Sequence, residues 1–400
     1  MTPRLRASAS GLDKDTCPTP ESNPGPVDTK VAHIIKAKEI SKLESNLLIR
    51  NRGVFSGLHH LFALLAEGSS GDTFTELIKG LRLPTDLRST QCLHTATNSL
   101  LKSNYEDITL KSFNAMYAAC EIEVHKEFCD SAELYDTSVY RVQTDNTTKL
   151  ASDINYLICY VTEGQILNAV KARDLENLRM ILLDALYFKA NWTYPFDPTL
   201  TKEETFYNKV VGNVNMMFQK GQFPFSNLVS LRSFVVELPY GTDGKYSMLV
   251  ILPYPTVKIS EMYMNFTQVS LKDIFKRLQD DVDEYGLEDV DVKLPRFHIS
   301  TNVVLNKPLN NMGVYDIFQP DLASFQRVTK DDIFVSAIIH TADIEVTESG
   351  TVASAATVAT FSDRISAPYF HANRPFIYFI MEKTTTTVIF SGIYSKPTVY

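Results

Sequence analysis

A run of small, uncharged residues decides the fold. From Ser349 to Ser362 the sequence reads SGTVASAATVATFS, with no charge, no proline and no side chain larger than valine before Phe361. In an extended chain, alternate side chains point to opposite sides. One face would then carry only alanine and threonine: Thr351, Ala353, Ala355, Thr357 and Ala359. Because both faces are small and neutral, this segment could enter a sheet as a central strand, which tolerates neither a missing N–H nor an unpaired charge.

The same run could also be an ordinary buried strand or an alanine-rich helix. Its length argues against one ordinary strand, because strands average about 5–6 residues. From Thr351 to Arg364 there are 14 residues, which span roughly 45 Å when extended. The threonine and valine side chains weaken the helical alternative through their restricted rotamers. The sequence therefore indicates a long, strand-compatible ribbon that ends in one basic residue, Arg364, ahead of the first proline at Pro368.

Three motifs around this ribbon resemble the serpin family. The first is the hinge, Glu348-Ser349-Gly350-Thr351 followed by small residues through Thr357. The second is FHANRPFIYFI at residues 370–380, which fits the family signature position by position. The third is LDALYFKANW at residues 183–192, which includes the only tryptophan of the chain. Together these motifs are highly specific, and the resemblance extends from about residue 36 to residue 397.

The resemblance implies an α+β fold with three β-sheets, about nine helices and an exposed reactive-centre loop at about 348–368. We expect residues 31–400 to form one serpin domain. Residues 1–30 carry five prolines among Ser, Thr, Asp and Gly, so we expect a disordered N-terminal tail.

Hydrophobic periodicity predicts the elements of this domain separately from the resemblance. Helices are expected at 54–67, 73–81, 86–101, 125–134, 146–160 and 270–278. Strands are expected at 108–117, 178–188, 230–238, 246–252, 290–294, 334–346, 375–382 and 387–394. The mixed order of helices and strands favours the same α+β class.

Two counts predict the same scissile bond. In serpins the bond follows the residue 16 positions beyond the hinge Glu, and it lies 11 positions before the signature Pro. Counted from Glu348 and from Pro375, both rules give Arg364–Ile365. An arginine at this position suits trypsin-like proteases, whose specificity pocket holds a buried carboxylate that pairs with a guanidinium. The competing interpretation is that Arg364 is an ordinary solvated surface charge.

The resemblance also implies a mechanism, in which the protein is a suicide-substrate inhibitor rather than an enzyme. A trypsin-like serine protease would cleave after Arg364, the ribbon Thr351–Arg364 would insert into the main sheet, and the protease would be trapped as a covalent complex. The hinge residues of this process are Glu348, Gly350, Thr351, Ala353, Ala355, Ala356 and Thr357. No cofactor and no metal is implied. We expect a monomer, with loop–sheet polymers as a hazard of the exposed ribbon.

Further site residues follow from matching family positions. Arg296 is expected to pair with Glu348, although a pair of this kind at the surface contributes little. His340 matches a histidine in the centre of the family's main sheet. Near it the chain departs from the family pattern: Arg50-Asn51-Arg52-Gly53 replaces a common Ser-Pro-x-Ser, and Asp184 replaces Asn. Asp184 could pair with His340 or with Arg50, and these substitutions bear on how readily the sheet opens.

The alternative function is that of a non-inhibitory serpin, a carrier or binding protein that kept the fold. Such serpins usually have charged, bulky or proline residues in the hinge, and this hinge has none. An unrelated enzyme is disfavoured, because the chain lacks Gly-x-Ser-x-Gly, His-Glu-x-x-His and Cys-x-x-Cys motifs.

Composition limits the partners and the location. A net charge of −8 without a basic stripe argues against nucleic acid, and no stretch has transmembrane length. The five cysteines show no metal spacing, and no disulfide framework is predicted. Asn146, Asn191 and Asn265 begin candidate glycosylation triplets. We therefore expect an extracellular, secreted glycoprotein of a clotting or invertebrate immune cascade, with a cytoplasmic protein as the alternative because no signal peptide is visible.

Overall fold

The computed structural model describes residues 56–81, 107–209, 211–266, 269–349, 368–384 and 386–397, together with residues 83, 86, 91 and 95. The expected helix at 86–101 falls almost entirely outside this part of the chain. So do Arg50, Gly53 and the loop residues from Gly350 to 367.

The described strands form three sheets, as expected for the fold. The main sheet has five strands in the order β10 (Phe297–Val304), β11 (Val335–Val346), β3 (Met180–Ala190), β1 (Ile108–Ala119) and β2 (Thr137–Val142). A four-stranded sheet follows the order β12 (Tyr369–His371), β9 (Glu288–Pro295), β5 (Gly212–Phe223) and β4 (Lys202–Phe206). The third sheet follows the order β14 (Thr387–Tyr394), β13 (Phe376–Glu382), β8 (Tyr246–Pro253), β7 (Ser233–Tyr240) and β6 (Phe225–Leu228).

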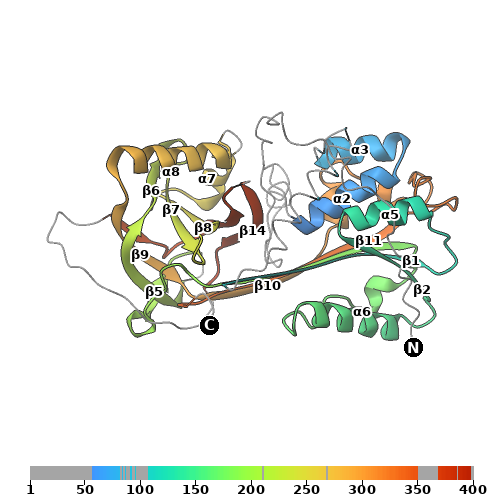
Figure 1. The fold of residues 1–400 in the computed structure, drawn as a ribbon, viewed down its shortest axis with the longest axis horizontal. Coiled ribbons are helices and arrows are strands. Elements are labelled where there is room, and N and C mark those ends of the chain that lie inside the picture. Colours follow the sequence, from blue (N-terminus) through green and yellow to red (C-terminus); the bar gives the residue numbers. More distant parts are fainter. Residues whose placement is uncertain are drawn as a thin grey trace.

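Helices cover both faces of one end of the main sheet. Figure 1 shows α2 (Ser56–Gly68) and α5 (Lys126–Leu134) on one side and α6 (Thr147–Val161) on the other. A strand buried on both faces needs apolar side chains at nearly every position. This is why β3 reads MILLDALYFKA, with ten of its eleven residues buried.

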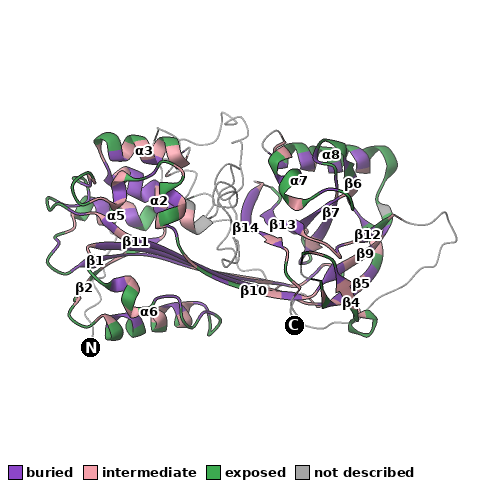
Figure 2. Ribbon diagram, turned by 180° about the vertical axis from the view of Figure 1, so that it is seen from behind, coloured by how far each residue is buried: buried purple, intermediate pink, exposed green. Residues whose placement is uncertain are grey.

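The other end of the main sheet packs against the two smaller sheets. Aromatic residues fill the space between them, including Phe188, Tyr240, Phe297 and Tyr378. On the far side of the third sheet, α7 (Ile259–Asn265) and α8 (Leu271–Tyr285) cover a separate apolar cluster. Figure 2 shows the result, with buried strands inside and exposed outer faces on the helices.

Local sequence signals account for several helix boundaries. Ser270 and Asp273 form a capping box at the start of α8, and Asn146 caps α6 by accepting a hydrogen bond from Lys149 N. Together with α3 (Gly71–Leu81) and α9 (Asn306–Asn310), the described residues contain seven α-helices, fewer than the nine or so expected for the whole domain. The chain therefore has the α+β fold that the sequence predicts.

Candidate functional site

The centre of the main sheet is a seam between two parallel strands. Strands β3 and β11 pair directly from Val335↔Met180 to Ile344↔Phe188. A chain that reverses direction after β11 and enters this seam would run antiparallel to both neighbours. Antiparallel pairing satisfies the backbone groups of all three strands. The seam therefore has the polarity needed to accept a strand from the segment that follows β11.

The hinge glutamate is anchored at the end of this seam, directly after β11. Glu348 is only 7% exposed, and its Oε1 accepts a hydrogen bond of 2.8 Å from the hydroxyl of Thr201. Arg296, between β9 and β10, brings its Nη1 to 3.5 Å from the same oxygen. The two contacts satisfy a carboxylate that would otherwise be costly to bury. The sequence named Arg296 as the partner of Glu348, but it gave no sign of Thr201.

Trp192 and the residues after it hold the backbone of the hinge. The indole N–H donates to the carbonyl of Thr347 at 2.8 Å, and the backbone N–H of Trp192 donates to Ser349 O at 3.3 Å. Phe196 N donates to Glu348 O at 2.8 Å. Since Trp192 lies two residues after the end of β3, these bonds tie the ends of the two seam strands together. They must be released if the strands are to separate at this end.

Trp192 is stacked on a second buried aromatic side chain, Tyr240. The rings of Trp192 and Tyr240 lie 4.2 Å apart and are nearly parallel, at 12°. Burial raises the pKa of Tyr240 well above its ordinary value, with a further contribution from Tyr378. The phenol therefore stays neutral at physiological pH, and the stack carries no charge.

A buried acid–base pair joins the seam strands near their middle. Asp184 of β3 and His340 of β11 occupy the same register position, and the Nδ1 of His340 is hydrogen-bonded to Oδ2 of Asp184. Their side chains are 1% and 3% exposed. Removing one partner from a buried pair leaves the other uncompensated. The pair is therefore a link that opening of the seam would have to break.

Polar atoms continue this row across the sheet to β1. Asn114 of β1 lies opposite Asp184 in the antiparallel ladder and is 4% exposed. The Oδ1 atoms of Asn114 and Asp184 have no hydrogen-bond partner among the described residues. The row therefore places three buried polar side chains on the adjacent strands β1, β3 and β11, in the centre of an otherwise apolar sheet.

The remaining predicted site residues fall into two groups. Those outside the described residues are Arg50, Gly53, Gly350, Thr351, Ala353, Ala355, Ala356, Thr357, Arg364 and Ile365. Of the glycosylation candidates, Asn146 is exposed, whereas Asn191 and Asn265 are half-buried. Asn191 also donates its Nδ2 to Asp107 at 3.2 Å, so the atom that would carry a glycan is engaged.

Thr201, Phe196 and Asn114 were not found by sequence reasoning. Thr201 and Phe196 both bond to Glu348, which lies 147 positions after Thr201 and 152 positions after Phe196. Neither residue belongs to one of the three motifs. Asn114 interrupts the buried, apolar half of β1, which reads FNAMYAA at residues 113–119. A lone polar residue of that kind is the one signal that could have suggested a buried polar row.

A comparison with protein families identifies the family. A family model described as serpin (serine protease inhibitor) matches residues 54–397. The chain belongs to the serpin family. It is 30% identical over 348 residues to leukocyte elastase inhibitor A of Rattus norvegicus, which covers 84% of this chain and 90% of that protein. It is 28% identical over 355 residues to antithrombin-III of Homo sapiens, covering 84% of this chain and 74% of the relative.

Solved serpin structures agree with this assignment. The crystal structure of Serpin48, described as a highly specific serpin of the insect Tenebrio molitor, superposes with a TM-score of 0.73 at 26% identity. The match covers 89% of this chain and 95% of that one. This serpin therefore belongs to a family of serine protease inhibitors and is not itself an enzyme. In the part of the chain that the structure describes, no three His, Cys, Asp or Glu residues are placed to hold a metal, and no helix is long and apolar enough to cross a membrane.

Proposed function

We propose that this serpin inhibits trypsin-like serine proteases as a suicide substrate that is cleaved at Arg364–Ile365. The observation that carries the proposal is the parallel seam between β3 and β11, which ends at the anchored hinge residue Glu348. The ribbon from Thr351 to Arg364 begins three residues after Glu348, and up to Thr360 it has the small, uncharged side chains that a central strand requires. Residues 31–400 would form the inhibitory domain, with the reactive loop at about 348–368.

The first step is ordinary acyl transfer. The protease serine Oγ attacks the carbonyl carbon of Arg364, the bond to Ile365 breaks, and the amine of Ile365 leaves with a proton from the protease histidine. The carboxyl group of Arg364 is then an ester of the protease serine. Hydrolysis of this ester by water would give a cleaved serpin and a free protease.

Insertion competes with that hydrolysis. Once Arg364 is separated from Ile365, the ribbon is free to enter the seam, and it would carry the linked protease along the sheet. Inhibition requires insertion to be faster than hydrolysis, so the links across the seam set the outcome. These links are the Glu348 contacts, the Trp192 hydrogen bonds and the Asp184–His340 pair.

A second candidate function is a carrier or binding protein with the serpin fold. The buried Asp184, at a position where the family usually has Asn, supports it, because a stronger link across the seam would slow insertion. The hinge sequence speaks against it, since it has no charged, bulky or proline residue from Gly350 to Thr357.

Titration of trypsin tests the proposal. A fixed amount of trypsin is incubated with increasing amounts of the protein, and the residual activity is measured on a small chromogenic substrate. We expect activity to fall to zero near one to a few equivalents, and Arg364→Ala to abolish inhibition. An Arg364→Lys variant serves as the matched control, because trypsin-like proteases also accept lysine. Loss of the inhibitor by cleavage without loss of trypsin activity would favour the non-inhibitory alternative.

We further propose that the protein acts outside the cell as a monomeric, glycosylated regulator of a protease cascade. Asn146 is the best candidate for a glycan, because it is the exposed one of the three sites. Its Oδ1 caps α6, which leaves its Nδ2 available for attachment. Mass spectrometry of the protein from its native source, with and without glycosidase, would measure this.

A further inference from the structure

At the far end of the seam the ladder between β3 and β11 is irregular, and side-chain hydrogen bonds supplement it. The pairing of β11 with β3 shifts register between Val335 and Ala337, so Ser336 lies in an irregular position between them. Its carbonyl accepts a hydrogen bond of 2.9 Å from Asn306 Nδ2 of α9. Such irregularities bend a strand and redirect one residue. Here the residue that is redirected is a serine.

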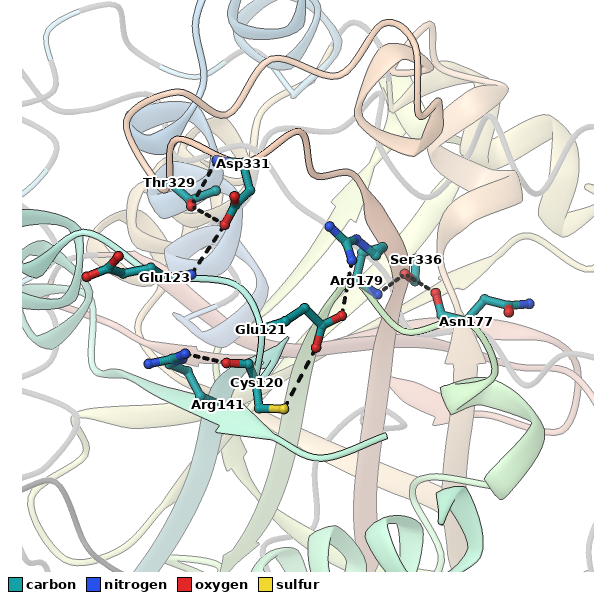
Figure 3. Close-up of polar contacts among 9 residues, drawn as sticks. All are labelled: Cys120, Glu121, Glu123, Arg141, Asn177, Arg179, Thr329, Asp331 and Ser336. Carbon is teal, nitrogen blue, oxygen red and sulfur yellow. Dashed lines mark hydrogen bonds and ion pairs between the residues drawn. The ribbon is translucent and has the colours of Figure 1, made fainter. Parts of the chain in front are cut away.

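The hydroxyl of Ser336 joins the start of β11 to the residues just before β3. Arg179 N, directly before β3, donates to Ser336 Oγ at 2.9 Å, and the hydroxyl donates to Asn177 O at 3.3 Å. Figure 3 shows both contacts, with Ser336 between Arg179 and Asn177. Asn177 has a left-handed backbone, with φ of 54°, which is unfavourable for most residues. The hydroxyl therefore also holds the turn that leads into β3.

Arg179 extends the connection to the end of β1. Its carbonyl accepts from Ala119 N at 3.1 Å, and its Nη1 lies 3.1 Å from Oε1 of Glu121. The ion pair is partly exposed, with side-chain exposures of 34% and 56%, so it contributes little on its own. The tightest link between β3 and β11 in this cluster is the serine hydroxyl.

The ribbon is long enough to reach the end of the seam at Ser336. The seam spans the ten residues of β11 from Val335 to Ile344, or roughly 33 Å, whereas the 14-residue ribbon spans roughly 45 Å. If Thr351 lies beside Val346, each later residue lies beside one residue earlier in β11. Phe361 would then lie beside Ser336, and Arg364 beyond it.

From this geometry we infer that Ser336, with Arg179 and Asn177, forms a clasp that the last residues of the loop must open. The inference deepens the proposed function and rests on it. In this account Ser336 is a positioning residue for inhibition. It does not touch the protease, but it governs how fast the final residues enter the seam and so how much acyl-enzyme escapes by hydrolysis.

Peptide annealing tests the clasp without a protease. A 14-residue peptide with the sequence of residues 351–364 should reach past Ser336, whereas a 9-residue peptide with that of residues 351–359 should end above it. The rate at which each peptide binds the intact protein is measured by native gel electrophoresis for the wild type and for Ser336→Ala. We expect the longer peptide to anneal about 2–10-fold faster to the variant, which is the range for the net loss of one hydrogen bond. The shorter peptide should anneal at the same rate to both.

Two further variants make the test specific. Ser336→Thr keeps a hydroxyl and should behave like the wild type with both peptides. Glu121→Gln removes only the exposed ion pair and should change the rates less than 2-fold. If Ser336→Ala speeds the annealing of both peptides equally, the variant destabilises the sheet in general. If it speeds the annealing of neither, there is no clasp. Either result overturns the inference while the proposed function stands. If neither peptide anneals to any variant, the seam does not accept a strand, and both fail.

Discussion

The Asp184–His340 pair gives a prediction whose size follows from its burial. The two side chains are 1% and 3% exposed, and they join the strands that must separate. Asp184→Ala removes the acceptor and leaves His340 buried without it. Breaking a buried pair in this way costs about 3–5 kcal/mol of native stability. Asp184→Asn keeps an acceptor and loses only the charge assistance, which costs about 1–1.5 kcal/mol.

These energies convert into melting temperatures. Unfolding entropy is about 2.1 cal/mol/K per residue, or roughly 0.7 kcal/mol/K over the roughly 340 residues that match the family. Asp184→Ala should therefore lower the melting temperature of the native state by about 4–7 °C, and Asp184→Asn by about 1–2 °C. Differential scanning fluorimetry at pH 7.4 measures both variants beside the wild type.

The melting temperatures of the two variants show whether the Asp184–His340 pair holds the seam. If Asp184→Ala melts within 1 °C of the wild type, the pair does not hold the seam, and the argument from burial is wrong. If Asp184→Asn is as damaging as Asp184→Ala, a second partner of the carboxylate carries the energy. Annealing of the 14-residue peptide provides an independent readout, since a weaker link between β3 and β11 should also speed strand entry.

The hinge supports three more predictions. Glu348→Ala should speed peptide annealing and promote polymers on warming, because it removes the contacts of Glu348 with Thr201 and Arg296. Glu348→Gln should have a smaller effect, since it keeps the acceptor for Thr201. Size-exclusion chromatography after incubation at 45 °C measures the amount of polymer formed by each variant. Thr351→Arg should turn the inhibitor into a substrate, because its charge would have to be buried in the sheet, and a stoichiometric complex formed by this variant would refute the insertion step. Trp192 is the only tryptophan of the chain and its indole bonds to the hinge, so its fluorescence should change when the 14-residue peptide, which has no tryptophan, anneals to the seam, and an unchanged emission on annealing would contradict its role at the hinge.

The apolar strands could be predicted because burial on both faces leaves a clear pattern. Strand β3 is apolar at nearly every position, and β11, β13 and β14 are similar. This run of apolar residues is lost in strands that have one face exposed to solvent or that contain a glycine. Strand β5 reads GNVNMMFQKGQF and was not predicted, and β12 has only three residues. Their place in a sheet depends on pairing with β9, which is a tertiary contact.

Some residues of the site could be named from the sequence, whereas others depend on contacts between distant parts of the chain. The motifs contain Glu348 and Asp184, and matching family positions named Arg296 and His340. The sequence left open whether Asp184 pairs with His340 or Arg50, and the structure places His340 against it. The roles of Trp192 and Phe196 at the hinge could not be predicted, because their hydrogen-bond partners are backbone carbonyls, which every residue has. The irregularity at Ser336 likewise depends on register across the seam.

The covalent complex is the most direct test of the central claim. The protein is mixed with trypsin for a short time, boiled in detergent and separated on a denaturing gel, and the released peptides are sequenced by mass spectrometry. We expect a band at the summed mass of trypsin and the serpin less its carboxy-terminal fragment, which begins at Ile365. Cleavage after Arg364 with no such band would contradict the claim that insertion outruns hydrolysis. A fragment that begins at any other residue would contradict the assignment of the scissile bond.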